Sequence, residues 1–286
     1  MTAGTTELTL AIPCFNAARY LTETLEGCLR QTVTPSEILV IDDGSTDDSA
    51  SVASGFPVRL LRHTTNQGVA QARNTALKNA STPLIAFVDA DATPCTWLVE
   101  KMLAEFDGED IVAVGGRGLE LESRSVSDRW RSIFWQQTHG DRCIDDAWMV
   151  MGLCCAFRTD ALRAIGGFDA RFRRTAEDVD VSLRLRAAGG RLVYDPDIWV
   201  MHRRKDSPFS LARMVGMHAH GQTQAILLNR GRVSWLHTNA LKWLIVSSGS
   251  SLRRHRSLPL AALSIPLGLI SIASRAAAHL REDGRA

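Results

Sequence analysis

The stretch Leu84-Ile-Ala-Phe-Val-Asp-Ala-Asp91 decides the fold class, because an unbroken apolar run is followed at once by two acids. A short apolar run bounded by polar residues predicts a strand that is buried on both faces of a sheet. Two carboxylates one residue apart at its end, Asp89 and Asp91, can hold a hard divalent cation that bridges phosphate oxygens. A solvated turn is the alternative for an isolated acid pair, so the surrounding sequence has to decide.

Apolar runs alternate with helical patterns on both sides of this stretch. Further strands are predicted at residues 8–12, 37–41, 58–61 and 111–114, with helices starting near Asn16, after Ser45, after Asn66 and at Pro94. Strands that alternate with helices predict βαβ units, a mostly parallel sheet and an α/β fold. Because ligands gather at the carboxyl ends of such strands, residues 13–16, 42–43 and 89–91 are expected to lie together at one edge of the sheet.

The second half is less regular. Residues 120–148 combine charged side chains with Trp130, Trp135 and Trp148. A helix is predicted to start near Asp178, and residues 191–201 are predicted to form two strands with a bend at Pro196.

Residues 200–286 form a basic tail. They contain 13 Lys or Arg against 3 Asp or Glu, whereas residues 1–199 contain 20 against 28. This asymmetry predicts an anionic partner for the tail, and membrane phospholipid and a lipid-phosphate substrate are both candidates. Nucleic acid is not expected as a partner, because no nucleic-acid-binding motif accompanies the charge.

Two apolar stretches in the tail, residues 235–252 and 257–274, raise the question of a membrane. Lys242 interrupts the first and two prolines interrupt the second. If both crossed as a hairpin, the Arg-rich turn between them would face outward, against the positive-inside tendency. We expect the tail to lie on the cytoplasmic face of the membrane; a true span and a soluble helix or oligomer contact are the alternatives.

The start of the chain and its cysteines point to the cytoplasm. Residues 1–7 lack the basic and apolar regions of a secretory signal. The six cysteines form no CxxC pair and match no zinc spacing, so reduced thiols are the simpler expectation.

Several segments in a fixed order resemble the family 2 glycosyltransferases of the GT-A fold, which are inverting enzymes. The segments are Ile12-Pro-Cys-Phe-Asn16, Val40-Ile-Asp-Asp-Gly-Ser-Thr-Asp47, Asn66-Gln-Gly-Val-Ala-Gln-Ala-Arg-Asn74, Phe87-Val-Asp-Ala-Asp91, Gly166-Gly-Phe-Asp169 and Glu177-Asp178. The resemblance covers about residues 8–205. It implies a GT-A domain over residues 1–205, with a nucleotide-binding half to about 115 and an acceptor half over about 116–205. Residues 206–286 then form the basic helical tail.

The resemblance implies a donor site for a nucleoside-diphosphate sugar. Asp43 is expected to bind the base, and Pro13 and Asn16 to line the base pocket. Arg73 is expected to reach the base or the diphosphate, because a guanidinium fork suits phosphate oxygens. Asp89 is expected to meet the ribose or a metal. Surface or turn roles are the alternatives for Asp43 and Arg73.

The cofactor implied is Mn²⁺ or Mg²⁺, held by Asp91 together with Asp89. His202 follows a predicted strand and is a third candidate ligand, with a purely structural histidine as the alternative. A bound divalent ion offsets the charge that develops on the leaving diphosphate without moving a proton.

The acceptor side rests on three residues. Asp178 is the expected catalytic base, because an acceptor hydroxyl is a poor nucleophile until a carboxylate takes its proton. The spacing of Thr175 and Asp178 also fits a helix capping box, which is the structural alternative. Glu177 is expected to orient the acceptor; the alternative is an acid in the first turn of a helix, where the helix dipole favours negative charge. Trp148 is expected either to stack on an acceptor sugar or to pack in the core.

These residues predict an enzyme that extends a saccharide, free or lipid-linked, in surface polysaccharide or glycolipid synthesis. Transfer directly onto a polyprenyl phosphate, and a non-catalytic sugar-binding protein of transferase ancestry, are the alternatives. A sugar nucleotidyltransferase would need a Gly-rich basic loop near the N-terminus, and the sequence contains none there. A dinucleotide oxidoreductase would need GxGxxG, which Gly115-Gly-Arg-Gly118 does not provide. The sugar, the base and the oligomeric state stay open.

Overall fold

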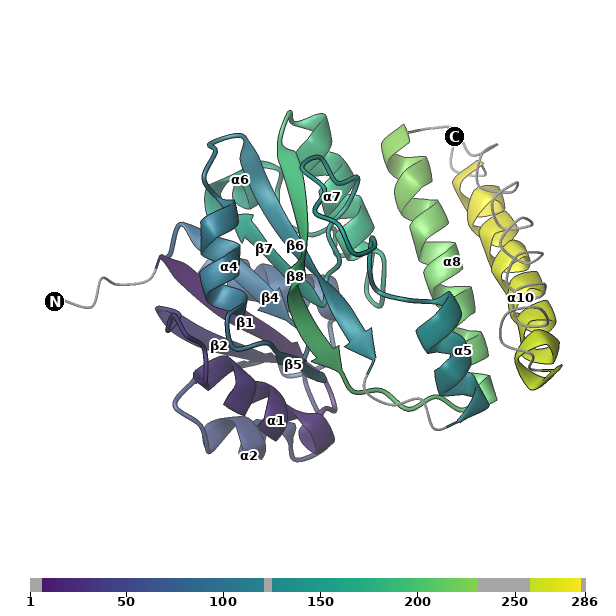
Figure 1. Ribbon diagram of the computed structural model, residues 1–286, viewed down its shortest axis with the longest axis horizontal. Helices are drawn as coiled ribbons and strands as arrows, with labels where there is room; N and C mark the ends of the chain where they lie inside the picture. Colours follow the sequence, from purple (N-terminus) through teal and green to yellow (C-terminus); the bar gives the residue numbers. More distant parts are fainter. Residues whose placement is uncertain (1–6, 121–124, 231–257, 284–286) are drawn as a thin grey trace, which may run out of the picture. The chain divides into compact units, whose positions relative to one another are not determined.

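The computed structural model describes residues 7–120, 125–230 and 258–283 (Figure 1). The chain divides into two compact units. Unit 1 consists of Met1–Leu119 and Gln137–Arg203, and unit 2 of Glu120–Gln136 and Arg204–Ala286. Unit 2 thus takes in residues 120–136 as well as the C-terminal helices.

Unit 1 is built on one mixed sheet of eight strands. The strands are β1 (Leu8–Cys14), β2 (Glu37–Asp42), β3 (Arg59–Arg62), β4 (Leu84–Val88), β5 (Ala92–Pro94), β6 (Ile111–Glu120), β7 (Cys154–Arg158) and β8 (Arg191–His202). Their order is β3-β2-β1-β4-β7-β6-β8-β5, and β3, β2, β1 and β4 run parallel. β7 joins β4 and β6 in antiparallel pairs. The predicted α/β fold with a mostly parallel sheet flanked by helices is confirmed.

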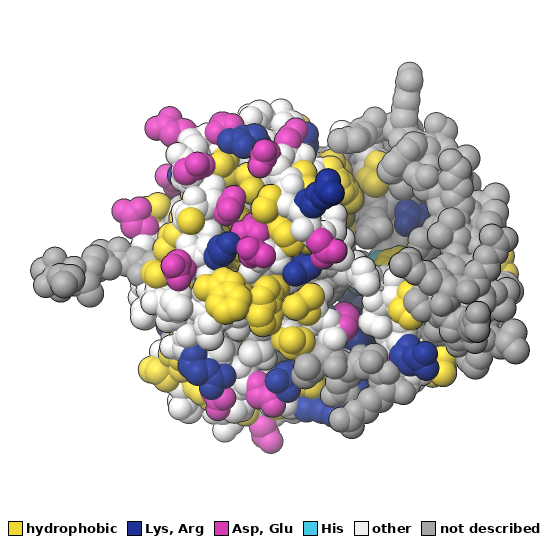
Figure 2. Space-filling model, in the orientation of Figure 1, with side chains coloured by type: hydrophobic (Ala, Val, Ile, Leu, Met, Phe, Trp, Pro, Cys, Tyr) yellow, Lys and Arg dark blue, Asp and Glu magenta, His cyan; other side chains and the backbone are white. Residues whose placement is uncertain are grey.

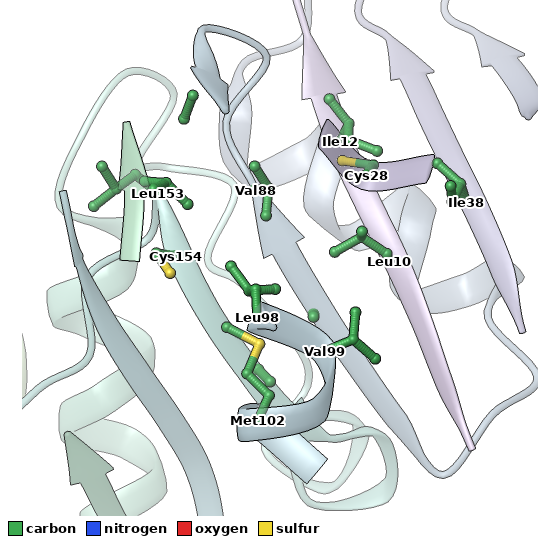
Figure 3. Packing of buried hydrophobic residues seen from close by; sticks show 14 of the residues in the cluster. Leu10, Ile12, Cys28, Ile38, Val88, Leu98, Val99, Met102, Leu153 and Cys154 are labelled. Atoms are coloured by element: carbon green, nitrogen blue, oxygen red, sulfur yellow. The ribbon is translucent and has the colours of Figure 1, made fainter. Parts of the chain in front are cut away.

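Helices cover both faces of this sheet (Figure 1). They are α1 (Ala18–Leu29), α2 (Ser49–Ser54), α3 (Val69–Asn79), α4 (Leu98–Glu105), α6 (Thr159–Ala164) and α7 (Glu177–Ala187). Alternate residues of β1 separate two cores: Leu10 and Ile12 pack with α1 and α4, and Ala11 packs with α3. Figure 3 shows the first core, where Leu98 and Met102 of α4 lie over the sheet. Burial on both faces explains why the central strands are continuous apolar runs.

Some local predictions were wrong. Residues 191–202 form one continuous strand, β8, instead of two strands with a bend at Pro196. The helix predicted from Pro94 starts at Leu98, because residues 92–94 pair with β8 as β5. The first helix, expected to start near Asn16, has Ala17 as its N-cap and begins at Ala18. Cross-strand pairing and loop contacts, which no local pattern reveals, override the propensities at these points.

Unit 2 contains the helices α5 (Val126–Phe134), α8 (Pro208–Arg230) and α10 (Leu258–Asp283). A small apolar core joins them through Trp130 of α5, Leu211, Met214 and Val215 of α8, and Leu267 of α10. In the described part of the chain, no helix combines the length and hydropathy needed to cross a membrane. The apolar stretch 235–252 lies outside the described residues.

On the face of unit 1 seen in Figure 2, acidic and basic side chains are interspersed. The basic excess of the sequence belongs instead to residues 200–286. The absence of a nucleic-acid partner stays a prediction.

Candidate active site

Three strand ends bring the predicted donor residues to one edge of the sheet. In the parallel pairing of β1 and β2, Cys14 lies opposite Asp42. In the pairing of β1 and β4, Ala11 lies opposite Phe87, two residues before Pro13 and Asp89 respectively. Residues 13–16, 42–43 and 89–91 therefore leave the sheet side by side, as the order of strands and helices predicted.

Asn16 fixes the loop after β1. Its backbone is left-handed, with φ of 51°, a conformation that asparagine tolerates better than most residues. The Asn16 N–H donates to Ser45 Oγ at 2.9 Å, and its Oδ1 accepts from the Thr46 N–H at 2.8 Å. The loops after β1 and β2 are thus tied together, and Asn16 and the partly buried Pro13 lie at the rim where a base was predicted.

The carboxylate of Asp43 is buried and surrounded by hydrogen-bond donors. Oδ1 contacts His63 Nδ1 at 2.6 Å and accepts from the Gln67 N–H at 2.9 Å. Oδ2 accepts from Asn66 Nδ2 at 3.0 Å and from the Gly68 N–H at 2.7 Å. A carboxylate offers about four acceptor positions. Protein groups occupy all of them here, so Asp43 organises residues 63–68, and its contact with a base stays a prediction.

Arg73 is buried at the centre of the site and joins residues from distant parts of the chain. Its guanidinium contacts Glu177 Oε1, lies 3.1 Å from Asp89 Oδ1 and donates to the Gly152 carbonyl at 2.9 Å. Its carbon Cζ lies 5.6 Å from the ring centroids of both Phe87 and Phe168. The Arg73 guanidinium, which was expected to reach the donor, thus forms ion pairs with Glu177 and Asp89.

Glu177 and Asp178 begin α7, where the helix dipole favours negative charge. Burial raises the pKa of Glu177 to about 7, opposed by Arg73 and reinforced by Asp178. Its Oε2 is buried without a hydrogen-bond partner. Asp178 is partly exposed; its Oδ2 accepts from the Gly152 N–H at 3.0 Å and its Oδ1 from the Val179 N–H at 2.8 Å.

The capping alternative for Asp178 is wrong. The N-cap of α7 is Ala176, whose φ is 70°, and no side chain caps it. The Asp178 carboxylate accepts from the Gly152 N–H instead and is partly exposed.

Asp91 and His202 lie together because β5 pairs with β8. Ala92 is opposite His202 in that pairing, and His202 Nε2 lies 3.5 Å from Asp91 Oδ2. The His202 side chain is buried, whereas Asp89 and Asp91 are each about one-third exposed, at 34% and 33%. Burial raises the pKa of Asp89, with Arg73 and His202 opposing and Asp91 adding to the rise.

These side chains suit a divalent cation that completes its coordination with phosphate. Within the described residues, no cluster of three or more His, Cys, Asp or Glu encloses a metal. Mg²⁺ in nucleotide enzymes commonly takes one or two carboxylates and fills its other positions with substrate phosphates and water, and Mn²⁺ favours similar oxygen ligands. Asp91 supplies such a carboxylate, and a cation would offset the repulsion between the negative charges of Asp89 and Asp91. The residues present therefore fit the predicted ion.

Trp148 is 47% exposed, so core packing is not its role. Its ring meets His139 edge to face, with centroids 6.2 Å apart, and His139 Nε2 lies 3.0 Å from the Met149 carbonyl oxygen. The same loop reaches Gly152, which contacts both Arg73 and Asp178. A held, exposed aromatic face on this loop suits a sugar ring.

The sequence prediction missed two residues of the site. Gly152 donates its N–H to Asp178, its carbonyl oxygen accepts from Arg73, and a Cβ there would lie 2.6 Å from Arg73 Nη1. His63 bridges Asp43 and Thr75, with its Nε2 2.9 Å from Thr75 Oγ1. A lone glycine and a lone histidine give no signal in the sequence, because only the folded chain brings their partners close.

The sequence model of the family described as glycosyl transferase family 2 matches residues 9–166, more than half of the chain. The chain belongs to glycosyl transferase family 2. The matched segment includes the residues at the ends of β1, β2 and β4, whereas Glu177, Asp178 and His202 lie beyond it.

Family 2 relatives extend over more of the chain. The pre-mycofactocin glycosyltransferase of Mycobacterium tuberculosis is 28% identical over 280 residues, which cover 90% of this chain and 56% of that protein. The chain therefore spans little more than half the length of that relative. Glycosyltransferase AglE of Haloferax volcanii is 26% identical over 257 residues, covering 86% of this chain and 82% of the relative.

A solved structure shares the fold over nearly the whole chain. It is the mannosyltransferase PcManGT from Pyrobaculum calidifontis in complex with GDP-Man and Mn²⁺, with a TM-score of 0.68 and 17% identity. The match covers 95% of this chain and 87% of that one. At this identity the likeness shows the family 2 fold and no more.

Proposed function

We propose that this family 2 protein is a glycosyltransferase that moves a sugar from a nucleoside-diphosphate sugar to an acceptor hydroxyl, with Mn²⁺ or Mg²⁺ as cofactor. The observation that carries the proposal is the contact of one buried guanidinium, that of Arg73, with Asp89 on the donor side and Glu177 beside Asp178. This link holds a donor-side carboxylate and an acceptor-side carboxylate in one rigid arrangement.

In this proposal the donor diphosphate lies at the ends of β1, β2 and β4. Asn16 and Pro13 line the base pocket, and Asp43 supports it through residues 63–68. Asp89, Asp91 and His202 hold the cation, which would offset the charge that develops on the leaving diphosphate. The mannosyltransferase and its GDP-Man and Mn²⁺ support the choice of donor and ion.

Asp178 is the proposed base. Its carboxylate is held by the backbone N–H groups of Gly152 and Val179 and remains partly exposed, so an acceptor hydroxyl can reach it. Glu177 is the proposed acceptor-orienting residue beside Asp178, and its Oε2 has no hydrogen-bond partner among the described residues. Trp148 offers the acceptor ring a stacking face. A single displacement with one base inverts the anomeric centre.

We further propose that the acceptor is a glycan or lipid-linked glycan of the cell surface, and that the protein works at the cytoplasmic face of the membrane. The basic residues 200–286 support this, because anionic phospholipid attracts such a segment.

Replacing Asp178 with Asn tests the proposal. We expect loss of turnover, at least about a hundredfold, with unchanged affinity for the donor nucleotide, since general base catalysis contributes roughly 10²–10⁴. Asp160→Asn, on an exposed helix position, is the matched control and should leave turnover unchanged. Full activity of Asp178→Asn would remove Asp178 from this role.

A further inference from the structure

Arg275 of α10 lies against α8, and no acidic partner of it is found among the side chains that the structure describes. Its Nε is buried and makes no hydrogen bond, and its Nη1 donates to Thr223 Oγ1 at 3.4 Å. α8 and α10 lie side by side, and a Cβ at Gly216 would approach Ser274 Oγ to 3.2 Å. The close approach of the two helices explains why Nε of Arg275 is shielded from water.

Other arginines with a buried, unbonded Nε are all compensated by acids. In the described part of the chain these are Arg73, Arg117, Arg131 and Arg203, which pair with Glu177 and Asp89, Asp141, Glu120 and Asp206, and Glu23 respectively. For Arg275, the described contacts include a hydroxyl and no carboxylate. A partly buried cation without a counter-charge is costly, and burial lowers the pKa of Arg275.

The sequence supplies few acids to this pair of helices. Residues 207–281 contain no Asp or Glu at all. Asp206, just before α8, binds Arg131. Among the described side chains of α8 and α10, no carboxylate therefore compensates the charge of Arg275.

The neighbouring groups are polar and fixed. The Thr223 hydroxyl donates to the Ala219 carbonyl at 2.8 Å, so its oxygen accepts from Arg275. His220 Nδ1 lies 3.1 Å from the Ser274 carbonyl oxygen; because a carbonyl only accepts, Nδ1 carries the proton. A preorganised guanidinium among polar groups suits a tetrahedral oxyanion, whose oxygens match its fork.

We propose that Arg275, oriented by Thr223, is the anchor of a phosphate-binding site on unit 2, separate from the donor site. A lipid phosphate headgroup and a soluble phosphate group present the same chemistry to this arginine. The site would recruit the phosphate independently of sugar transfer.

Thermal unfolding of the full chain tests the site with inorganic phosphate as the probe. We expect phosphate to raise the Tm of the wild type by several degrees, and KCl of equal ionic strength to have no such effect. Arg275→Met should lose most of the response, with affinity at least about tenfold weaker, because a charged hydrogen bond is removed. Arg213→Met, on an exposed position of α8, is the matched control and should respond like the wild type.

Two further measurements keep the test decisive. Without phosphate, Arg275→Met should unfold at or above the wild-type Tm, because the variant removes an uncompensated charge; this excludes misfolding as the cause of a lost response. Sedimentation with phosphatidic acid vesicles, against phosphatidylcholine vesicles, separates the sources. If Arg275→Met alone loses binding to phosphatidic acid vesicles, the ligand is a lipid headgroup. If Arg275→Met binds these vesicles as the wild type does but no longer responds to phosphate, the ligand is a soluble phosphate. If Arg275→Met responds to phosphate as the wild type does, or the wild type responds to neither probe, the proposal is wrong.

Discussion

Arg73→Met would remove the cation that compensates the buried carboxylate of Glu177. Four interactions disappear with it: the ion pairs with Glu177 and with Asp89, the hydrogen bond to the Gly152 carbonyl and the contact with the Phe87 and Phe168 rings. Removing one partner of a buried ion pair costs about 3–5 kcal/mol, because the other charge is left unpaired. We expect the free energy of unfolding to fall by that amount.

A second substitution isolates the ion pair. In Arg73→Met combined with Glu177→Gln the buried charge of Glu177 is not stranded, and the loss reduces to the partly exposed pair with Asp89, the hydrogen bond and the ring contacts, about 2 kcal/mol together. The double variant should therefore be more stable than Arg73→Met by about 1–3 kcal/mol. Urea unfolding at about pH 8, where Glu177 would be ionised, measures both values.

The exposed pair of Arg30 and Glu26 is the matched control. Its side chains are 62% and 46% exposed, so Arg30→Met should cost less than about 1 kcal/mol. If Arg73→Met costs no more than Arg30→Met, or if the double variant is as unstable as the sum of the single ones, the reasoning about Arg73 is refuted.

Two further predictions concern the same network. Gly152→Ala would place a methyl group 2.6 Å from Arg73 Nη1, and the partners of Arg73 prevent the guanidinium from moving away. We therefore expect kcat to fall at least about tenfold. Gly55→Ala, at an exposed position, is the control and should leave kcat unchanged. The pKa of Glu177, raised from 4.5 to about 7 by burial, means that the folded chain holds more protons than the unfolded chain in this range. The free energy of unfolding should therefore decrease as pH rises from about 4.5 to about 7, and urea titrations should find a weaker decrease in Glu177→Gln; an identical pH profile would contradict the assignment.

Sequence reasoning located the sheet and its ligand edge because both depend on local patterns. The apolar runs at residues 8–12, 37–41 and 84–88 are buried on both faces of the sheet, and periodicity alone identifies such strands. The acids that follow them lie at the edge where parallel strands end.

What the sequence could not reveal depends on contacts between distant residues. Arg73 meets Glu177 across 104 positions, and no local pattern distinguishes an arginine on a surface from one that joins two carboxylates. Likewise β5 is a three-residue strand that exists only because β8 pairs with it, and this pairing is what brings His202 to Asp91.

The most direct test of the account is the binding of nucleoside diphosphates with and without metal. We predict that calorimetric titration with UDP and GDP finds a nucleotide that binds at least about tenfold more tightly with Mn²⁺ than with EDTA, because a cation held by Asp91 in the proposed site would offset the charge of the diphosphate. Asp91→Asn should abolish the difference, whereas Asp160→Asn should preserve it. Equal affinity in Mn²⁺ and EDTA, or no binding of any nucleotide, would contradict a metal-dependent donor site at Asp89-Ala90-Asp91.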